Sequence, residues 1–76
     1  MFTVRQIRYF DALASTLHFR KAAELAHVSQ PALSAQIAEM EAIAGAPLFE
    51  RSQRQVIMTE LGKHLYPGIK AILREL

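Results

Sequence analysis

The sequence predicts a mainly α fold that carries one small β-hairpin. Three observations support this prediction. Apolar residues recur at helical spacing along most of the 76 residues. Capping residues divide that pattern into a series of helices. Two short β-prone runs interrupt it ahead of the last helix.

The first helix is predicted over residues 4–17. Thr3 and Gln6 fit a capping box, in which each side chain bonds the backbone N–H of the other residue. The apolar residues that recur on one face of this helix are Val4, Ile7, Phe10, Leu13, Ala14 and Leu17. This stripe covers roughly half of the helix circumference and is expected to face the core.

The second and third helices follow each other so closely that they must cross at a steep angle. The second is predicted over residues 19–26. The third is predicted over residues 30–43, where Ser29 fits the N-cap and Pro31 the first turn. So tight a turn is typical of the helix-turn-helix unit. It requires left-handed backbone at His27, where a glycine is more common.

The two β-prone runs predict a hairpin after the third helix. Gly45 is expected to end that helix. Residues 48–51 and 56–58 are expected to pair across a polar loop, residues 52–55. A hairpin at this place is the wing of a winged helix-turn-helix.

The last helix is expected to begin after Thr59 as its cap, with Glu60 in the first turn. Pro67 and Gly68 should kink this helix or split it in two. Its apolar stripe consists of Leu61, Leu65, Ile69, Ile72, Leu73 and Leu76. The stripe is either core or a dimer interface. Because it reaches the final residue, we expect the chain to be a fragment of a longer protein.

The composition argues against several functions. The sequence has no cysteine, which excludes disulfides, cysteine-ligated zinc and thiol chemistry within it. The spacing of His18, His27 and His64 does not fit a metal site. Neither a phosphate-binding loop nor a catalytic serine motif is present, and no apolar run is long enough to span a membrane. We therefore expect no enzyme activity, no metal, no cofactor and no membrane partner.

The third helix has one face that fits nucleic acid. Residues 25–38 contain no charged side chain, although the net charge of the chain is +2. The outer face of the helix holds Gln30, Pro31, Ser34, Ala35 and Ala38. Gln and Ser can hydrogen-bond base edges, Gln pairing best with adenine, and Pro and Ala can contact a thymine methyl group. This face is expected to read the major groove.

Basic residues flank this face. Arg20 and Lys21 begin the second helix, and Arg51 and Arg54 lie in the predicted wing. They are expected to bind phosphates, and a wing arginine also fits a narrow minor groove. Alternatively, the polar residues of the third helix are ordinary solvated side chains and the wing arginines protect a strand edge. The domain would then be a winged helix that binds protein and not DNA, a hypothesis that the neutral face and the basic wing disfavour.

The segments described above resemble the DNA-binding domain of the LysR-type transcriptional regulators. The resemblance rests on residues 18–23 (HFRKAA), 28–37 (VSQPALSAQI), 45–51 (GAPLFER), Arg54 and residues 56–62 (VIMTELG). It covers essentially the whole chain. Residues 18–20 and 27–31 are most similar to the peroxide-sensing branch of the family.

The resemblance implies a winged helix-turn-helix over residues 1–58 and a linker helix for dimerisation over residues 59–76. It implies a bacterial, cytoplasmic, nucleoid-associated regulator whose larger C-terminal domain, which binds a small-molecule effector, is absent from this sequence. The implied partners are an interrupted inverted repeat in double-stranded DNA and a second copy of the chain. Higher oligomers are expected in the full-length protein.

The resemblance also implies the residues of each site. The DNA contacts would be Ser29, Gln30, Pro31, Ala32, Ser34 and Gln36 of the third helix, Arg51 and Arg54 of the wing, and Arg20. The dimer contacts would be the six residues of the apolar stripe in the last helix. Many family members carry basic residues where Ala35 and Ala38 stand, so Arg20 and the wing should supply more of the binding here.

Overall fold

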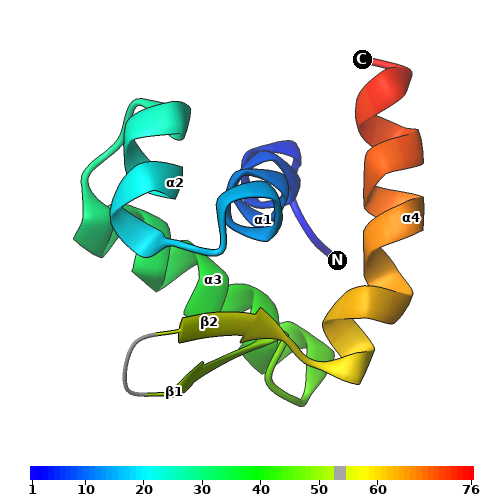
Figure 1. Ribbon diagram of the computed structural model, residues 1–76. Helices are drawn as coiled ribbons and strands as arrows, with labels where there is room; N and C mark the ends of the chain where they lie inside the picture. The colour runs from blue at the N-terminus through cyan, green and yellow to red at the C-terminus, as the bar shows by residue number, and fades with distance from the viewer. Residues whose placement is uncertain (53–54) are drawn as a thin grey trace.

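The computed structural model describes residues 1–52 and 55–76 and contains four helices and one hairpin. The elements are α1 (Val4–Thr16), α2 (Phe19–Ala26), α3 (Gln30–Ala44), β1 (Phe49–Ser52), β2 (Gln55–Met58) and α4 (Glu60–Arg74). Helix α1 lies at the centre with α2 and α3 packed on one side of it and α4 on the other, and the hairpin lies below α3 (Figure 1). This is the predicted winged helix-turn-helix with a following helix.

Side-chain caps begin the helices where the sequence predicts them. Thr3 and Gln6 form the capping box, with both side chain to backbone hydrogen bonds at 3.0 Å. Ser29 caps α3 by accepting from the N–H of Ala32 at 3.2 Å, and Thr59 caps α4 in the same way. These predictions are confirmed because a cap depends only on residues within one turn of it.

Left-handed backbone ends the first three helices. His27 has φ 59°, as the tight turn between α2 and α3 requires, and Gly45 has φ 79° after α3. Leu17 also has a positive φ, 51°, and its N–H bonds the carbonyl of Leu13 at 2.7 Å. The first helix therefore ends one residue before the predicted boundary, at a leucine that carries no sequence signal for this conformation.

The hairpin is confirmed, with strand bounds that differ slightly from the prediction. Phe49 pairs with Met58 and Ser52 pairs with Gln55, so β1 is shifted by one residue. Ser52 and Gln55 were expected in the loop and instead form the last pair of the ladder. Leu48, expected to begin the first strand, lies just before it and is fully buried. Its burial anchors the hairpin to the helices.

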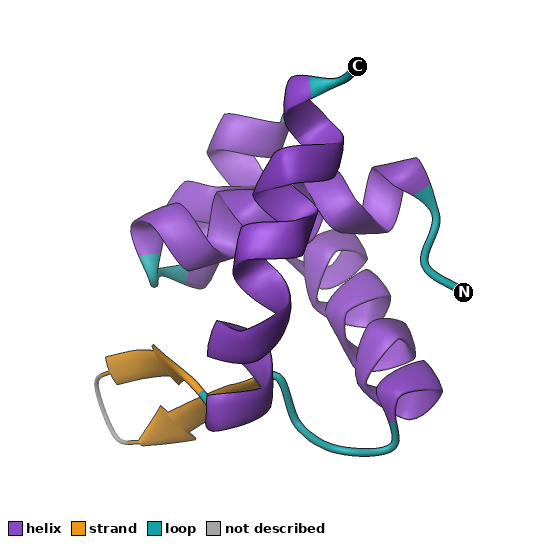
Figure 2. Cartoon of the chain, turned by 90° about the vertical axis from the view of Figure 1, so that its right-hand side faces the viewer, coloured by secondary structure: helices purple, strands orange, loops and turns teal. Residues whose placement is uncertain are grey.

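Helix α4 continues through Pro67, so of the two predicted outcomes, a kink or a split, the split is wrong. Leu65 and Tyr66 before the proline and Ile69 after it all pack against the core, and Pro67 itself faces solvent. This packing holds the helix on both sides of the residue that cannot donate a hydrogen bond. Figure 2, viewed from the α4 side, shows α4 rising from the hairpin in front of the other helices.

The apolar stripe of α4 divides between the core and the surface. Ile69 is 4% exposed and belongs to the same core as Phe10 and Leu33. Leu61, Leu65 and Leu73 are half-buried against that core, whereas Ile72 and Leu76 are exposed. Ile69, predicted as a dimer contact, therefore stabilises the single chain and has almost no surface left for a partner. Within the described ranges no helix is long and apolar enough to cross a membrane.

Two polar contacts fix the hairpin between α3 and α4. The Glu41 carboxylate of α3 accepts from the N–H groups of Leu48 and Phe49, at 2.7 and 3.1 Å. At the start of α4, the Thr59 hydroxyl donates to the carbonyl of Pro47 at 2.8 Å. Gly62 lies so close to the Leu48 carbonyl that any side chain would collide with it. The wing is therefore attached to both helices at its base.

Candidate nucleic-acid interface

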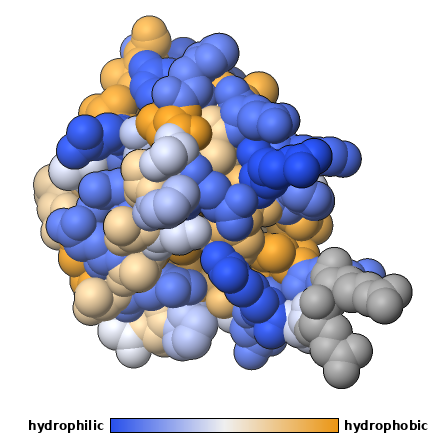
Figure 3. All heavy atoms as spheres, turned by 90° about the vertical axis from the view of Figure 1, so that its left-hand side faces the viewer, coloured by the Kyte–Doolittle hydropathy of each residue, from blue (hydrophilic) through white to orange (hydrophobic). Residues whose placement is uncertain are grey.

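Helix α3 exposes the face that the sequence predicts for base reading. Leu33, Ile37 and Met40 are buried beneath it. Of the predicted face, Gln30, Pro31, Ala35 and Ala38 are exposed and Ser34 is half-buried. Ala32 is exposed as well, and none of these residues carries a charge. The face of the molecule in Figure 3 is mostly hydrophilic, with patches of intermediate and of hydrophobic residues between the polar ones. Small uncharged residues of this kind allow a second surface to approach the helix closely.

The predicted site residues Ser34 and Arg51 meet at one edge of α3. The guanidinium carbon of Arg51 lies 3.7 Å from the centroid of the Phe19 ring, which is a cation–π contact. Arg51 Nη2 also donates to Ser34 Oγ at 3.5 Å, the long limit for a hydrogen bond. The cation of β1 is thus held against α2 and α3, while the Arg51 residue remains exposed.

An open groove runs between the start of α2, the start of α3 and the hairpin. Arg20, Gln30 and Arg51 line it together with His18. Three of the predicted DNA contacts, which come from three different elements, therefore share one surface. Two of them are permanently charged, and the third can hydrogen-bond.

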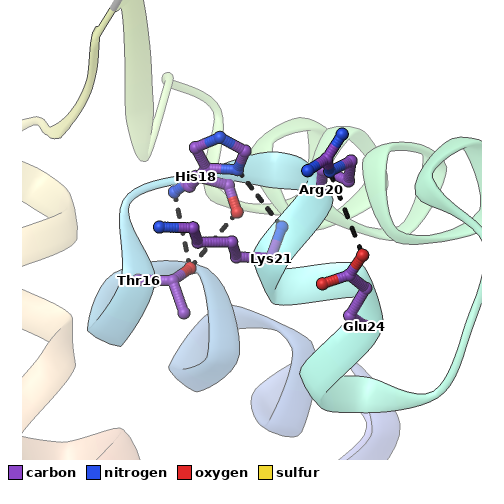
Figure 4. A network of polar contacts seen from close by, with 5 residues as sticks. All are labelled: Thr16, His18, Arg20, Lys21 and Glu24. Carbon is purple, nitrogen blue, oxygen red and sulfur yellow. Dashed lines mark hydrogen bonds and ion pairs between the residues drawn. The ribbon is translucent and has the colours of Figure 1, made fainter.

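The start of α2 is capped by a histidine, a role that sequence reasoning missed. His18 Nδ1 accepts from the backbone N–H of Lys21 at 3.2 Å, and the N–H of His18 donates to Thr16 Oγ1 at 3.4 Å (Figure 4). His18 precedes the helix directly, and its imidazole can accept a hydrogen bond as an Asn or Ser cap does. The position of His18 directly before α2 is the sequence feature that could have identified it as the N-cap.

Arg20 projects from the first turn of α2 and is available to an anion. Its only ion pair among the described residues is with Glu24, one turn along the helix, at 3.9 Å with both side chains exposed (Figure 4). Such a surface pair is worth at most about 1 kcal/mol, so a phosphate can displace it at little cost.

Gln36 lies at the opposite edge of α3 from Ser34 and has a structural partner. Its Oε1 accepts from Nε2 of Gln6, a buried residue of α1, at 3.1 Å. The predicted residue Ser29 is exposed, and its hydroxyl oxygen accepts the capping hydrogen bond of α3 while its O–H can still donate. Arg54, the second predicted wing arginine, lies outside the described residues.

Helix α4 is joined to α1 by a tyrosine that sequence reasoning did not single out. The Tyr66 hydroxyl donates to Asp11 Oδ1 at 2.9 Å, and the Tyr66 ring lies 5.7 Å from the Phe10 ring between centroids. Burial raises the pKa of Tyr66 to about 12, and the hydrogen bond to Asp11 and the negative charge of that carboxylate add to the effect. With Ile69, this contact fixes the direction in which α4 leaves the domain.

The geometry defines a winged helix-turn-helix domain with an exposed recognition helix. The chain belongs to the LysR family of bacterial regulatory helix-turn-helix proteins, whose family model matches residues 4–63.

Two curated relatives and one solved structure illustrate the similarity. The chain is 47% identical over 66 residues to the transcriptional regulator IlvR of Caulobacter vibrioides, covering 87% of the chain and 22% of that protein. It is 44% identical over 72 residues to the dual regulator OxyR of Escherichia coli, covering 95% and 24%. The DNA complex of the CbnR DNA-binding domain superposes with a TM-score of 0.90 at 36% identity, covering 96% of the chain and 84% of that domain. The chain thus spans about a quarter of the length of the curated relatives it matches.

Proposed function

We propose that the chain binds double-stranded DNA in a sequence-specific manner, as the DNA-binding part of a bacterial transcriptional regulator. The observation that carries this proposal is the shared groove, in which Arg20 and Arg51 flank the exposed, uncharged start of helix α3. The likeness to the DNA-bound CbnR domain supports it. Helix α3 would enter the major groove, and the hairpin would lie over the adjacent backbone.

The proposed contacts divide into two kinds. Gln30 would hydrogen-bond a base edge, and Pro31, Ala32 and Ala35 would contact thymine methyl groups or leave room for close approach. Arg20 and Arg51 would bind phosphates, which set affinity and register and carry no sequence information. For Arg54 the proposal of a phosphate or minor-groove contact rests on the sequence alone.

A second copy of the chain would form the dimer that binds the two halves of the DNA site. The exposed residues Ile72 and Leu76 of α4 leave apolar surface for a partner helix, with half-buried Leu73 beside them. Two copies related by a two-fold axis would present two α3 helices to an interrupted inverted repeat. Effector binding and higher oligomers would belong to further parts of a longer regulator acting at the nucleoid in the bacterial cytoplasm.

Selection of duplexes from a randomised pool tests this proposal. The chain should enrich sequences that carry two inverted half-sites, and it should bind the selected duplex more tightly than a scrambled duplex of equal length. Affinity should fall steeply with salt, because phosphate contacts release counterions. Failure to bind either duplex at low salt would contradict DNA binding and favour a winged helix that binds protein.

A further inference from the structure

Gln6 connects the first turn of α1 to the recognition helix. It is 2% exposed, so it contacts no solvent-borne ligand directly. Its Oε1 accepts from the backbone N–H of Thr3 at 3.0 Å, and its Nε2 donates to Oε1 of Gln36 at 3.1 Å. Gln36 itself is half-buried and stands one turn beyond the exposed residue Ala32.

These two hydrogen bonds determine the orientation of both amide groups. A backbone N–H can only donate, so the atom of Gln6 that faces Thr3 must be the oxygen. The atom of Gln6 that faces Gln36 is therefore the NH2 group, which can only donate. It follows that Gln36 must turn its oxygen toward Gln6, and that the Gln36 NH2 group is the part left for another partner.

We propose that Gln6 is a positioning residue that makes Gln36 a donor-only contact to DNA. The Gln36 NH2 group would donate to an acceptor atom of the duplex, either a phosphate oxygen or an acceptor on a base edge such as guanine O6 or N7. This inference rests on the proposed function. It separates Gln36 from Gln30, which is free to pair with adenine through both an acceptor and a donor.

The substitution Gln6→Glu reverses the orientation without removing the cap. Glutamate is the usual partner of threonine in a capping box, so the carboxylate keeps the bond to Thr3. It can only accept, so Gln36 would turn its NH2 group inward and present its oxygen to DNA. Because the new negative charge also repels DNA, the effect of Gln36→Ala must be compared in the two backgrounds, where the charge effect cancels.

The experiment measures affinity for the selected duplex by fluorescence anisotropy, using the wild-type chain, Gln6→Glu, Gln36→Ala and the double variant. Gln36→Ala should weaken binding about fivefold in the wild-type background, as expected for one hydrogen bond. It should cause no loss in the Gln6→Glu background. An equal loss in both backgrounds, or no loss in the wild type, would overturn the inference. A wild-type chain that binds no duplex would overturn the proposed function instead.

A series of duplexes with single base changes distinguishes the two acceptors. Loss of affinity that is the same on every duplex assigns the contact to phosphate, and loss confined to one guanine assigns it to a base edge. If replacing an adenine by purine, which lacks the 6-amino group, weakens wild type but not Gln36→Ala, Gln36 accepts a hydrogen bond and the inference is wrong.

Amide hydrogen exchange in the free chain provides a test that does not depend on a variant folding. The side-chain NH2 of Gln6 should exchange more slowly than that of Gln36, since among the described residues only the former donates a hydrogen bond. Slower exchange at Gln36 would overturn the assigned orientation.

Discussion

Arg51 lies over the ring of Phe19, with its guanidinium carbon 3.7 Å from the ring centroid. A cation–π contact leaves the charge of the guanidinium in place and N–H donors available, so it positions the cation without neutralising it. An apolar ring of α2 thus fixes the place of the hairpin charge, at the groove that Arg20 and Gln30 also line.

Replacing Arg51 by alanine should weaken binding to all duplexes alike. Loss of one phosphate contact should lower the slope of log affinity against log salt by about 1. Arg74→Ala removes the same charge at the far end of α4 and serves as the control, with the salt slope expected to stay unchanged. Equal slopes for wild type and Arg51→Ala would contradict the phosphate assignment.

The two isoleucines of α4 should respond differently to glutamate. Ile69→Glu buries an unpaired charge in the core and should destabilise the fold by about 3–5 kcal/mol, measured by urea denaturation. Ile72 is 47% exposed, so Ile72→Glu should change monomer stability by less than about 0.5 kcal/mol and instead shift a dimer toward monomer in sedimentation. A sedimentation profile unaffected by Ile72→Glu would refute this part of the dimer interface.

The glycines of α4 provide a matched pair. Gly62→Ala places a methyl group against the Leu48 carbonyl and should cost about 1–3 kcal/mol through overpacking. A Cβ at Gly68 meets no atom within 4 Å, so Gly68→Ala should stabilise the helix by about 0.5–1 kcal/mol. Comparing the urea denaturation midpoints of the two variants tests whether Gly62 lies against the Leu48 carbonyl. Equal effects of the two substitutions would argue against that contact.

The contact between Tyr66 and Asp11 predicts a stability change at alkaline pH. The folded pKa of Tyr66, about 12, lies above the value near 10 expected for an unfolded chain. The stabilisation is therefore complete below pH 10 and is lost as the pH rises from about 10 to 12. Wild type should lose more unfolding free energy across this window than Tyr66→Phe. Parallel curves for the two proteins would contradict the hydrogen bond between Tyr66 and Asp11.

The sequence predicts best those features that depend on neighbouring residues. Thr3, Ser29 and Thr59 identify the helix starts because a cap acts within one turn. Pro67 does not split α4, because residues on both sides of it pack against the core, and these long-range contacts carry no local sequence signal. Helix α1 ends at Leu17 and not at a glycine, so no residue type in the sequence indicates the C-terminal boundary of this helix.

The sequence predicts which residues the candidate site comprises, and that assignment stays a prediction; it does not predict the contacts between them. The exposed face of α3 follows from helical periodicity and lies where the sequence places it. The partners of the site residues are distant in sequence, Phe19 for Arg51 and Gln6 for Gln36, and no local pattern indicates them. These partners can be identified only in the folded structure, where the helices pack against one another.

The most direct test of base reading by α3 is the affinity of Gln30→Ala for the selected duplex and for a scrambled duplex, at one salt concentration. Gln30 is exposed at the start of α3 in the shared groove, so its loss should reduce the difference in binding free energy between the two duplexes by about 1–3 kcal/mol while the scrambled duplex binds as before. An undiminished difference in Gln30→Ala would show that this face of α3 does not read the bases.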